Sequence, residues 1–323
     1  MSTKHVGILA AVAVGLILLM LALETDDTGS TAGQRLLPGL EAAANQLGEV
    51  RIASADESVT LLRTDGSWGI AERDGYPADI GQLRRLVLAL AEARVVERKT
   101  ANPDNYERLG IGDPAEGGDG ERLVLRGDGA EFAVLLGDPE RGDFRYARVA
   151  GEAQGVLIDR NPEAPAEPAA WLDGALTDLP EDEVRRVTIT HADGESVVIE
   201  KADAEQTDFT ATGIPEGREL QYDTIANGIG GALAGLAAED VRRAPDEPGE
   251  ADTVTVFETF DGGTVTVTVH EADGDGERAS WVGITAEPDA DGLNERTAGW
   301  EYRLPGFRED QLTRRWEDLL KAP

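Results

Sequence analysis

The residues able to do acid–base, redox or nucleophilic chemistry are few in this chain of 323 residues. It has no cysteine and three histidines, His5, His191 and His270. Without cysteine the chain cannot form a thiolate zinc site, an iron–sulfur cluster, a disulfide or a cysteine nucleophile. His191 and His270 each lie beside a turn, and no serine and aspartate accompany them in a pattern that favours a catalytic triad. The sequence therefore predicts a protein that is not an enzyme and has no cofactor.

A second set of residues that could do chemistry is the acidic run in the segment HEADGDGE, whose carboxylates could bind a metal ion. Glu271, Asp273, Asp275 and Glu277 alternate with other residues, and carboxylates at this spacing can chelate calcium. The run lacks the twelve-residue loop that ends in a bidentate glutamate. This departure favours a solvated hairpin loop, and we predict no metal site.

The charge balance excludes one class of partner. Asp and Glu number 63 against 30 Lys and Arg, which gives a formal net charge of −33. Nucleic-acid binding depends on clustered basic side chains that neutralise phosphates, so we predict no nucleic-acid partner. Carboxylates are too abundant for one pair to be singled out as a glycosidase couple. Because 41% of the residues are hydrophobic, the acidity belongs to a folded protein.

The elements that must position these residues begin with an uncharged stretch from Val6 to Leu23. A helix of this length rises roughly 27 Å, close to the hydrocarbon thickness of a bilayer. Lys4 precedes it and acidic residues follow it, so the positive-inside rule places the N-terminus in the cytoplasm. We predict a single-pass anchor in the inner membrane with the bulk of the chain in the periplasm. A cleaved signal peptide is the alternative, although no small-x-small cleavage site follows the stretch.

Composition breaks predict the organisation of the whole chain. The proline-rich stretch NPEAPAEPAA cannot form a helix or a central strand, and this predicts a linker. The predicted parts are a cytoplasmic N-terminus (1–5), the transmembrane anchor (6–23), a tether with an amphipathic segment (24–48), a first α+β unit (49–160), the linker (161–170) and a second α+β unit (171–323).

The two units are predicted to be tandem repeats, each an antiparallel sheet with one main helix packed on a face. In the first unit Asp79 caps a helix whose apolar face includes Leu83, Val87 and Leu90. Alternating runs and turn signals predict the strands of this unit at 50–52, 59–62, 68–70, 123–125, 132–136, 144–149 and 156–158.

The second unit is predicted to have a glycine-rich helix at 225–238 and a short C-terminal helix at 311–320. Its strands are predicted at 187–190, 197–200, 209–211, 254–260, 265–269, 281–284 and 300–304. Val254, Val256 and Phe260 are taken as the apolar positions of one strand. Val265, Val267 and Val269 are those of the next, with threonines on its other face.

A few aromatic and polar residues of the first unit are candidates for an interaction surface. Exposed aromatic side chains anchor many protein interfaces. The same residue types can instead pack in the core, cap a helix or form a turn. For most of them we favour the structural role. The candidates are Trp68, Tyr76, Pro77, Asp79, Asn102 and Tyr106.

Several short motifs in order and spacing resemble a known family, DUF4340. They are Leu37-Pro38-Gly39-Leu40, Trp68-Gly69-Ile70, Tyr76-Pro77-Ala78-Asp79, Ala89-Leu90-Ala91, Arg94-Val95-Val96-Glu97, Asn102-Pro103-Asp104-Asn105-Tyr106, Leu109-Gly110-Ile111, Asp113-Pro114, Trp171-Leu172-Asp173 and Asp178-Leu179-Pro180. The resemblance runs from about residue 37 to residue 189. It implies an extracytoplasmic protein anchored in the membrane and similar to portions of the auxiliary components of gliding-motility-type ABC transporters.

The resemblance leads to two functional expectations. The first is a non-enzymatic accessory subunit of an ABC-type export or gliding-motility-like complex, whose partner is the transporter permease or another inner-membrane protein. The chain has no GxxxxGK[ST] loop of its own with which to bind ATP. The alternative is a free-standing module that binds envelope polysaccharide or peptidoglycan.

Overall fold

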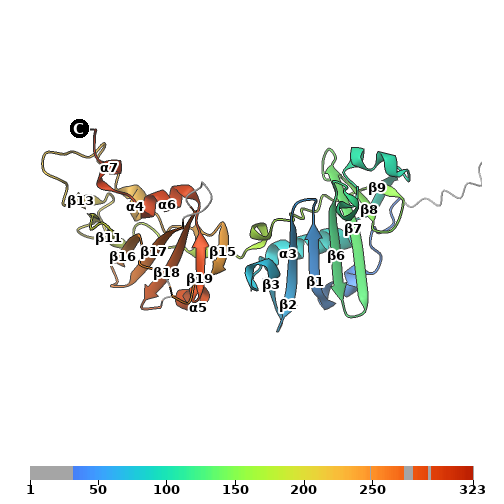
Figure 1. Ribbon diagram of the computed structural model, residues 1–323, viewed down its shortest axis with the longest axis horizontal. Helices are drawn as coiled ribbons and strands as arrows, with labels where there is room; N and C mark the ends of the chain where they lie inside the picture. The colour runs from blue at the N-terminus through green and yellow to red at the C-terminus, as the bar shows by residue number, and fades with distance from the viewer. Residues whose placement is uncertain (1–31, 248, 273–278, 290–291, 323) are drawn as a thin grey trace, which may run out of the picture. The chain divides into compact units, whose positions relative to one another are not determined.

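The computed structural model describes residues 32–247, 249–272, 279–289 and 292–322 (Figure 1). The fold is mostly β, with 39% strand and 20% helix. This composition corrects the predicted α+β class, in which each unit carried one main helix on its sheet. Among the described residues only one helix, α3, is long, and the other helical segments have seven residues or fewer.

The predicted inner-membrane anchor is also corrected. The residues predicted to span the bilayer, 6–23, lie outside the described residues. Within the described ranges no helix is long and apolar enough to cross a membrane. Helix α3 has 13 residues and rises only about 20 Å, against the ~30 Å that a span requires.

The strands follow one another along the chain with few helices between them. Their bounds are β1 Leu47–Ala53, β2 Ser58–Thr64, β3 Ser67–Ile70, β4 Tyr76–Pro77, β5 Val95–Arg98, β6 Glu121–Gly127, β7 Ala130–Pro139, β8 Arg145–Val149, β9 Gly155–Ile158, β10 Ala175–Thr177, β11 Val184–His191, β12 Ser196–Glu200, β13 Thr210–Thr212, β14 Leu236–Ala237, β15 Asp240–Arg243, β16 Thr253–Thr259, β17 Thr264–Ala272, β18 Ala279–Glu287 and β19 Trp300–Arg303.

The α-helices are α2 Leu40–Ala43, α3 Ile80–Glu92, α4 Asn227–Gly230, α5 Leu293–Thr297, α6 Gly306–Leu312 and α7 Trp316–Leu319. In the described part of the chain they are accompanied by short 3₁₀ helices, η1 Ala44–Gln46, η2 Ala71–Arg73, η3 Pro103–Asn105, η4 Glu107–Leu109, η5 Pro114–Glu116 and η6 Pro168–Trp171.

The chain divides into two compact units. One consists of the residues up to Leu47 with Ala53–Asp56 and Arg85–Ala164. The other consists of Pro165–Pro323 with Gly48–Ile52 and Glu57–Arg84.

The first large sheet has nine strands in the order β4-β3-β2-β1-β6-β7-β8-β9-β5. Strands β6 to β9 form an antiparallel meander, and β2, β3 and β4 form a second one. Every predicted strand of this part is present. Helix α3 begins behind Asp79, whose Oδ1 accepts a hydrogen bond from the backbone N–H of Gln82 at 2.9 Å, and this confirms the predicted cap. Leu83, Val87 and Leu90 of α3 are buried.

The second large sheet has eight strands in the order β13-β12-β11-β16-β17-β18-β19-β15, paired antiparallel. Alternate residues of its strands point into a buried core that includes Val187, Ile189, Phe257, Val267 and Val282. Helices α4, α6 and α7 lie together on one side of the sheet (Figure 1). Their apolar side chains Ile229, Leu312 and Leu319 belong to the same core.

The predicted glycine-rich helix at 225–238 is wrong in extent. Only Asn227–Gly230 is α-helical, turns follow, and Leu236–Ala237 forms strand β14. Gly235 has φ of +57°, in the left-handed region that ends helices. A Cβ on Gly230 would lie 2.1 Å from Cε2 of Phe209. The glycines of this segment therefore serve turns and close packing instead of a long helix.

The predicted C-terminal helix at 311–320 is likewise corrected. Helix α6 ends at Leu312, α7 begins at Trp316, and Arg315 between them has φ −104° and ψ 166°, which is extended backbone. Within the predicted linker Ala164 and Ala166 are buried, and Trp171, which follows the linker, is buried as well. The indole Nε1–H of Trp171 donates to the carbonyl of Pro165 at 2.8 Å.

The contact between Gly230 and Phe209 generates a stability prediction. Replacement of Gly230 by alanine should lower the free energy of unfolding by about 1–3 kcal/mol, because the added methyl overlaps the Phe209 ring. Gly228 is the matched control, since its nearest atom outside the helix backbone, Nε2 of Gln311, would lie 3.7 Å from an added Cβ. Gly228→Ala should be neutral or stabilising by up to ~1 kcal/mol. Urea unfolding of both variants measures the difference, and equal effects would contradict the packing argument.

Candidate functional site

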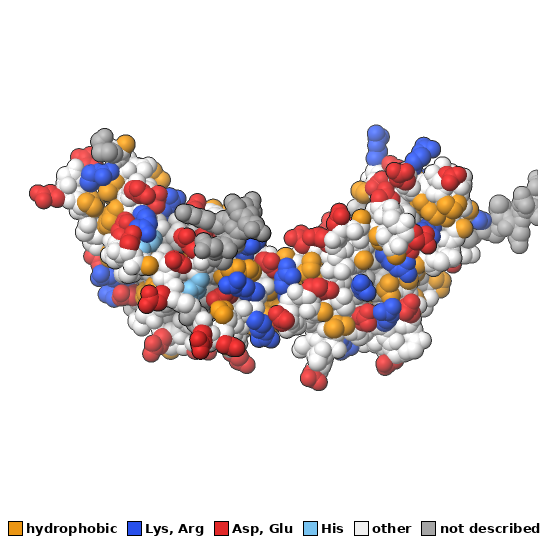
Figure 2. Space-filling view, in the orientation of Figure 1, with side chains coloured by type: hydrophobic (Ala, Val, Ile, Leu, Met, Phe, Trp, Pro, Cys, Tyr) orange, Lys and Arg blue, Asp and Glu red, His pale blue; other side chains and the backbone are white. Residues whose placement is uncertain are grey.

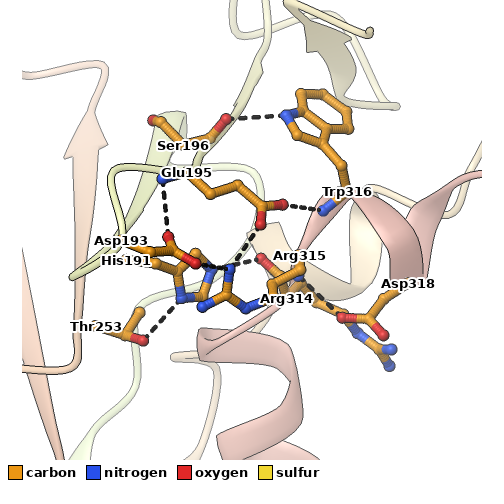
Figure 3. A network of polar contacts seen from close by, with 9 residues as sticks. All are labelled: His191, Asp193, Glu195, Ser196, Thr253, Arg314, Arg315, Trp316 and Asp318. Atoms are coloured by element: carbon orange, nitrogen blue, oxygen red, sulfur yellow. Dashed lines mark hydrogen bonds and ion pairs between the residues drawn. The ribbon is translucent and has the colours of Figure 1, made fainter.

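The first cluster with the side chains of an active site is a polar network in the second unit (Figure 3). The turn between β11 and β12 supplies His191, Asp193 and Glu195, and the break between α6 and α7 supplies Arg314 and Arg315. Nη1 of Arg315 lies 2.7 Å from Asp193 Oδ2 and 2.6 Å from Glu195 Oε2. Glu195 Oε1 accepts a hydrogen bond from the backbone N–H of Trp316 at 2.7 Å.

The arrangement of His191 is not that of a catalytic base. Its side chain is buried, and Nδ1 lies 3.0 Å from the Thr253 hydroxyl. Its Nε2 lies 3.2 Å from the carbonyl oxygen of Arg314. Ser196 enters the network through its backbone carbonyl, which accepts from the indole N–H of Trp316 at 3.0 Å. Both ring nitrogens are thus engaged in fastening the C-terminal segment to the sheet.

The electrostatics of the network support the same structural role. The backbone N–H of Glu195 and the guanidinium of Arg315 hold the pKa of the Asp193 carboxyl below its usual range. Glu195 and Asp193 in turn raise the pKa of Arg315. Asp193 is exposed and Arg315 and Glu195 are partly exposed, so the ion pairs are weak contributors to global stability and act by fixing geometry locally.

A distinct surface lies on the outer face of the eight-stranded sheet, opposite the buried core. We call it the outer face and define it as Thr188, Thr190, Val198, Val254, Val256, Thr266 and Thr268, from strands β11, β12, β16 and β17. All seven side chains are partly or fully exposed. They are uncharged in a chain in which 29% of the residues carry a charge. Apolar and hydroxyl-bearing side chains together make a surface suited to contact with another molecule.

The outer face arises because strand β16 turns its threonines inward. Thr253 and Thr255 are buried on the core side, where the Thr255 hydroxyl donates to the carbonyl of Leu312 at 2.6 Å. Val254 and Val256 consequently face outward, in register with Thr268 and Thr266 of β17. The prediction that Val254 and Val256 are the buried positions of this strand is therefore wrong. Phe257 lies on the same side of the strand as Thr253 and Thr255, and its large apolar side chain is the sequence signal that could have identified the inner side.

A cavity of about 300 Å³ adjoins the outer face at β17 and β18. Thr266, Thr268, Gly283 and Thr285 line one side, and the segment from Thr297 to Trp300 lines the other. A Cβ on Gly283 would lie 2.7 Å from the Thr268 hydroxyl oxygen, so the glycine keeps this side of the cavity open. The volume is at the lower end of the range for small-molecule sites, which is ~300–1,000 Å³.

Arginines and tryptophans meet at the neighbouring end of the same sheet. Figure 2 shows Lys and Arg side chains gathered near β15 and β19, whereas Asp and Glu are spread over the visible surface. The guanidinium of Arg242 lies 4.3 Å from the ring centroid of Trp281, and that of Arg303 lies 5.6 Å from it. Glu301, which is 5% exposed, accepts two N–H groups of Arg242 at 2.8 and 2.7 Å. These are cation–π contacts in a geometry fixed by a buried carboxylate.

Of the residues predicted from sequence as an interaction surface, several have structural partners. Tyr76 is buried, with its ring 4.9 Å from that of Trp300 and its hydroxyl 3.3 Å from the carbonyl of Asp173. Asp79 caps α3. Tyr106 donates to the carbonyl of Ala153 at 2.5 Å, and the guanidinium of Arg148 lies 4.4 Å from its ring centroid.

The remaining candidates lie at the surface. Asn102 is exposed, and its Oδ1 accepts from the backbone N–H of Asp104, which caps η3. Pro77 is exposed, and Trp68 is half-buried at the start of β3. The structure does not gather the six residues into one site. Sequence reasoning missed the outer face and the Trp281 cluster, because both depend on pairing between strands far apart in the chain.

The sequence predicts no metal site, and the structure describes only some of the residues to which this prediction applies. Among the described residues, no three His, Asp or Glu side chains converge as metal ligands. Asp273, Asp275 and Glu277 lie outside the described residues.

Comparison with known families identifies the relationship suggested by the sequence motifs. The family described as "Domain of unknown function (DUF4340)" matches residues 68–254, more than half of the chain. The chain belongs to the DUF4340 family. The match includes β11, β12 and the turn bearing His191, and it ends within β16. Comparisons with curated proteins and with solved structures found no match.

The polar network predicts how the C-terminal segment responds to a single substitution. Arg315→Gln removes the charge that joins Asp193 and Glu195, so amide hydrogen exchange should accelerate several-fold at residues 316–320 and stay unchanged in β16 and β17. Arg314→Gln is the control, because within the described chain only the backbone carbonyl of Arg314 enters the network. Equal acceleration in both variants would contradict the role of Arg315.

Acid should loosen the same segment. The pKa of Asp193 is lowered by its hydrogen bonds from the Glu195 N–H and Arg315, and that of Glu219 by Lys321, which also belongs to the C-terminal segment. A lowered folded-state pKa contributes stability that is complete above the ordinary value of about 4 and is lost as the pH falls through the folded-state value.

The measurement is the emission of Trp316 between pH 6 and pH 2, with Trp316→Phe to assign the signal. The double variant Asp193→Asn with Glu219→Gln should show the loosened signal already at pH 6 and a smaller change on acidification. An unchanged acid transition in the double variant would refute this assignment.

Proposed function

We propose that this DUF4340 chain is a non-catalytic subunit that binds a partner protein through the outer face. The observation that carries the proposal is the outward orientation of Val254 and Val256 among threonines, on a sheet whose other side is already covered. Burial of such a surface against a partner is favourable by roughly 25 cal/mol per Å² of apolar area. The nearest charged side chains on the same side of these strands are Arg186, Glu200 and Glu258, which pair with one another in the register row beside the outer face.

The class of partner follows from the family resemblance. Auxiliary components of ABC-type export or gliding-motility-like complexes are the proteins to which the motifs are similar, so the proposed partner is a subunit of such a transporter. In that complex the chain contributes a binding surface and no chemistry. This agrees with His191, whose two ring nitrogens are each within hydrogen-bond distance of a partner, the Thr253 hydroxyl and the carbonyl of Arg314.

A photocrosslinking amino acid at position 256 tests the proposal in the native host. We expect it to capture a transporter subunit, identified by mass spectrometry. Phe307 is the control position, because it is 60% exposed and equally apolar but lies on α6, on the covered side of the sheet. Capture of the same proteins from positions 256 and 307, or of none, would argue against the outer face as the interface.

A charge at the centre of the outer face gives the complementary test. Val256→Asp should lower recovery of the partner about tenfold or more, since an unpaired charge buried in an interface costs several kcal/mol. Phe307→Asp should leave recovery unchanged. Circular dichroism of both variants checks that they fold, and normal recovery with a folded Val256→Asp chain would refute the proposal.

A further inference from the structure

We propose that the end of the eight-stranded sheet formed by β17, β18 and β19 binds a carboxylated sugar. The inference goes beyond the proposed function and does not rest on it, because Arg303, Gly283 and Thr285 lie outside the outer face, and only Thr266 and Thr268 belong to both the outer face and the cavity. Two observations support it. The guanidinium of Arg303 has no acidic partner among the described residues, and a cavity lined by threonine hydroxyls lies on the same side of the eight-stranded sheet.

The available cation is Arg303. Its side chain is exposed, and within the described chain its one contact is with the ring of Trp281, where its guanidinium carbon lies 5.6 Å from the ring centroid. The carboxylate opposite it in the strand register, Asp240, is already engaged by Nε and Nη2 of Arg73 at 2.6 and 3.1 Å. Arg303 therefore has donors free for a ligand, in a chain of net charge −33.

Trp281 and Arg242 hold this end of the sheet in place. Arg242 is bound to buried Glu301 and lies against the Trp281 ring, so its positive charge is balanced locally. Arg303 supplies the unbalanced charge of the cluster. A guanidinium presents parallel N–H groups that match the two oxygens of a carboxylate.

The cavity begins two residues along β18 from Trp281, at Gly283, roughly 7 Å away on the same side of the sheet. Thr266 and Thr285, in register with each other, contribute hydroxyls with no hydrogen-bond partner among the described residues. Hydroxyl groups that both donate and accept, beside a glycine that leaves room, suit the hydroxyls of a sugar ring. A carboxylate of the same ligand is then within reach of Arg303.

A neutral sugar would leave Arg303 without a partner, and a simple inorganic anion would leave the cavity unfilled. An acidic peptide would satisfy the guanidinium but has no counterpart for the threonine hydroxyls. The combination favours a sugar acid.

Isothermal titration calorimetry on the full chain tests the assignment at 0.15 M salt, where the Debye length of about 8 Å screens the overall negative charge. The ligands are a galacturonic acid trimer, the same trimer with methyl-esterified carboxylates, and a glutamate trimer. We expect binding of the first and at least roughly tenfold weaker binding of the ester, the size of one lost charge-assisted hydrogen bond.

Variants locate the site. Arg303→Gln should weaken binding of the galacturonic acid trimer about tenfold, and Thr285→Val several-fold, since it removes one hydroxyl at nearly constant volume. Arg186→Gln, at the opposite end of β11 and half-exposed, is the control and should bind normally. No heat at millimolar ligand, equal binding of acid and ester, or unchanged binding by a folded Arg303→Gln chain would overturn the proposal. Preference for the glutamate trimer would also overturn it, in favour of an acidic peptide.

Discussion

The second unit depends on how the end of the chain is fastened to the inner side of its eight-stranded sheet. A sheet of this size exposes a wide apolar surface that must be covered. Residues 305–320 contribute Leu312 and Leu319 to that cover, in two short helices separated by residues 313–315, of which Arg315 is extended. The break leaves backbone carbonyls without intrahelical partners. The sheet satisfies them, with the Thr255 hydroxyl on Leu312 and His191 on Arg314.

This fastening explains the orientation of β16. A buried hydroxyl costs free energy unless it is hydrogen-bonded. The Thr255 hydroxyl donates to the carbonyl of Leu312, and the Thr253 hydroxyl is paired with Nδ1 of His191, whose Nε2 is paired with the carbonyl of Arg314. With Thr253 and Thr255 used on the inside, the strand places Val254, Val256 and Glu258 on the outside. The apolar character of the outer face and the attachment of the C-terminal segment are thus two results of one alternation of Thr and Val.

The same reasoning shows which features were predictable from the sequence. Alternation and turn residues located most strands of both large sheets but missed β4, β5 and β15, and the cap at Asp79 followed from local chemistry. Alternation alone could not assign the faces of β16, because Val and Thr have similar β-propensity and only Phe257 distinguished the sides. Apolar spacing predicted a helix at 225–238, but the contact of Gly230 with Phe209 and the left-handed Gly235 are tertiary features. The break before Trp316 depends on acceptors at Asp193 and Glu195, over 100 residues earlier.

The charge distribution connects the two proposed surfaces. A net charge of −33 repels further copies of the chain, so an uncharged outer face can stay accessible without promoting self-association. A partner of lower charge meets no such barrier at that face. An anionic ligand does meet it over most of the surface, and the repulsion is offset only where arginines lack acidic partners. Arg303 beside Trp281 is such a position, and its neighbour Arg242 is held there by Glu301. The strong overall acidity therefore restricts the binding of a protein partner to the uncharged outer face. It restricts the binding of an anionic ligand to positions such as Arg303, where an arginine has no acidic partner among the described residues.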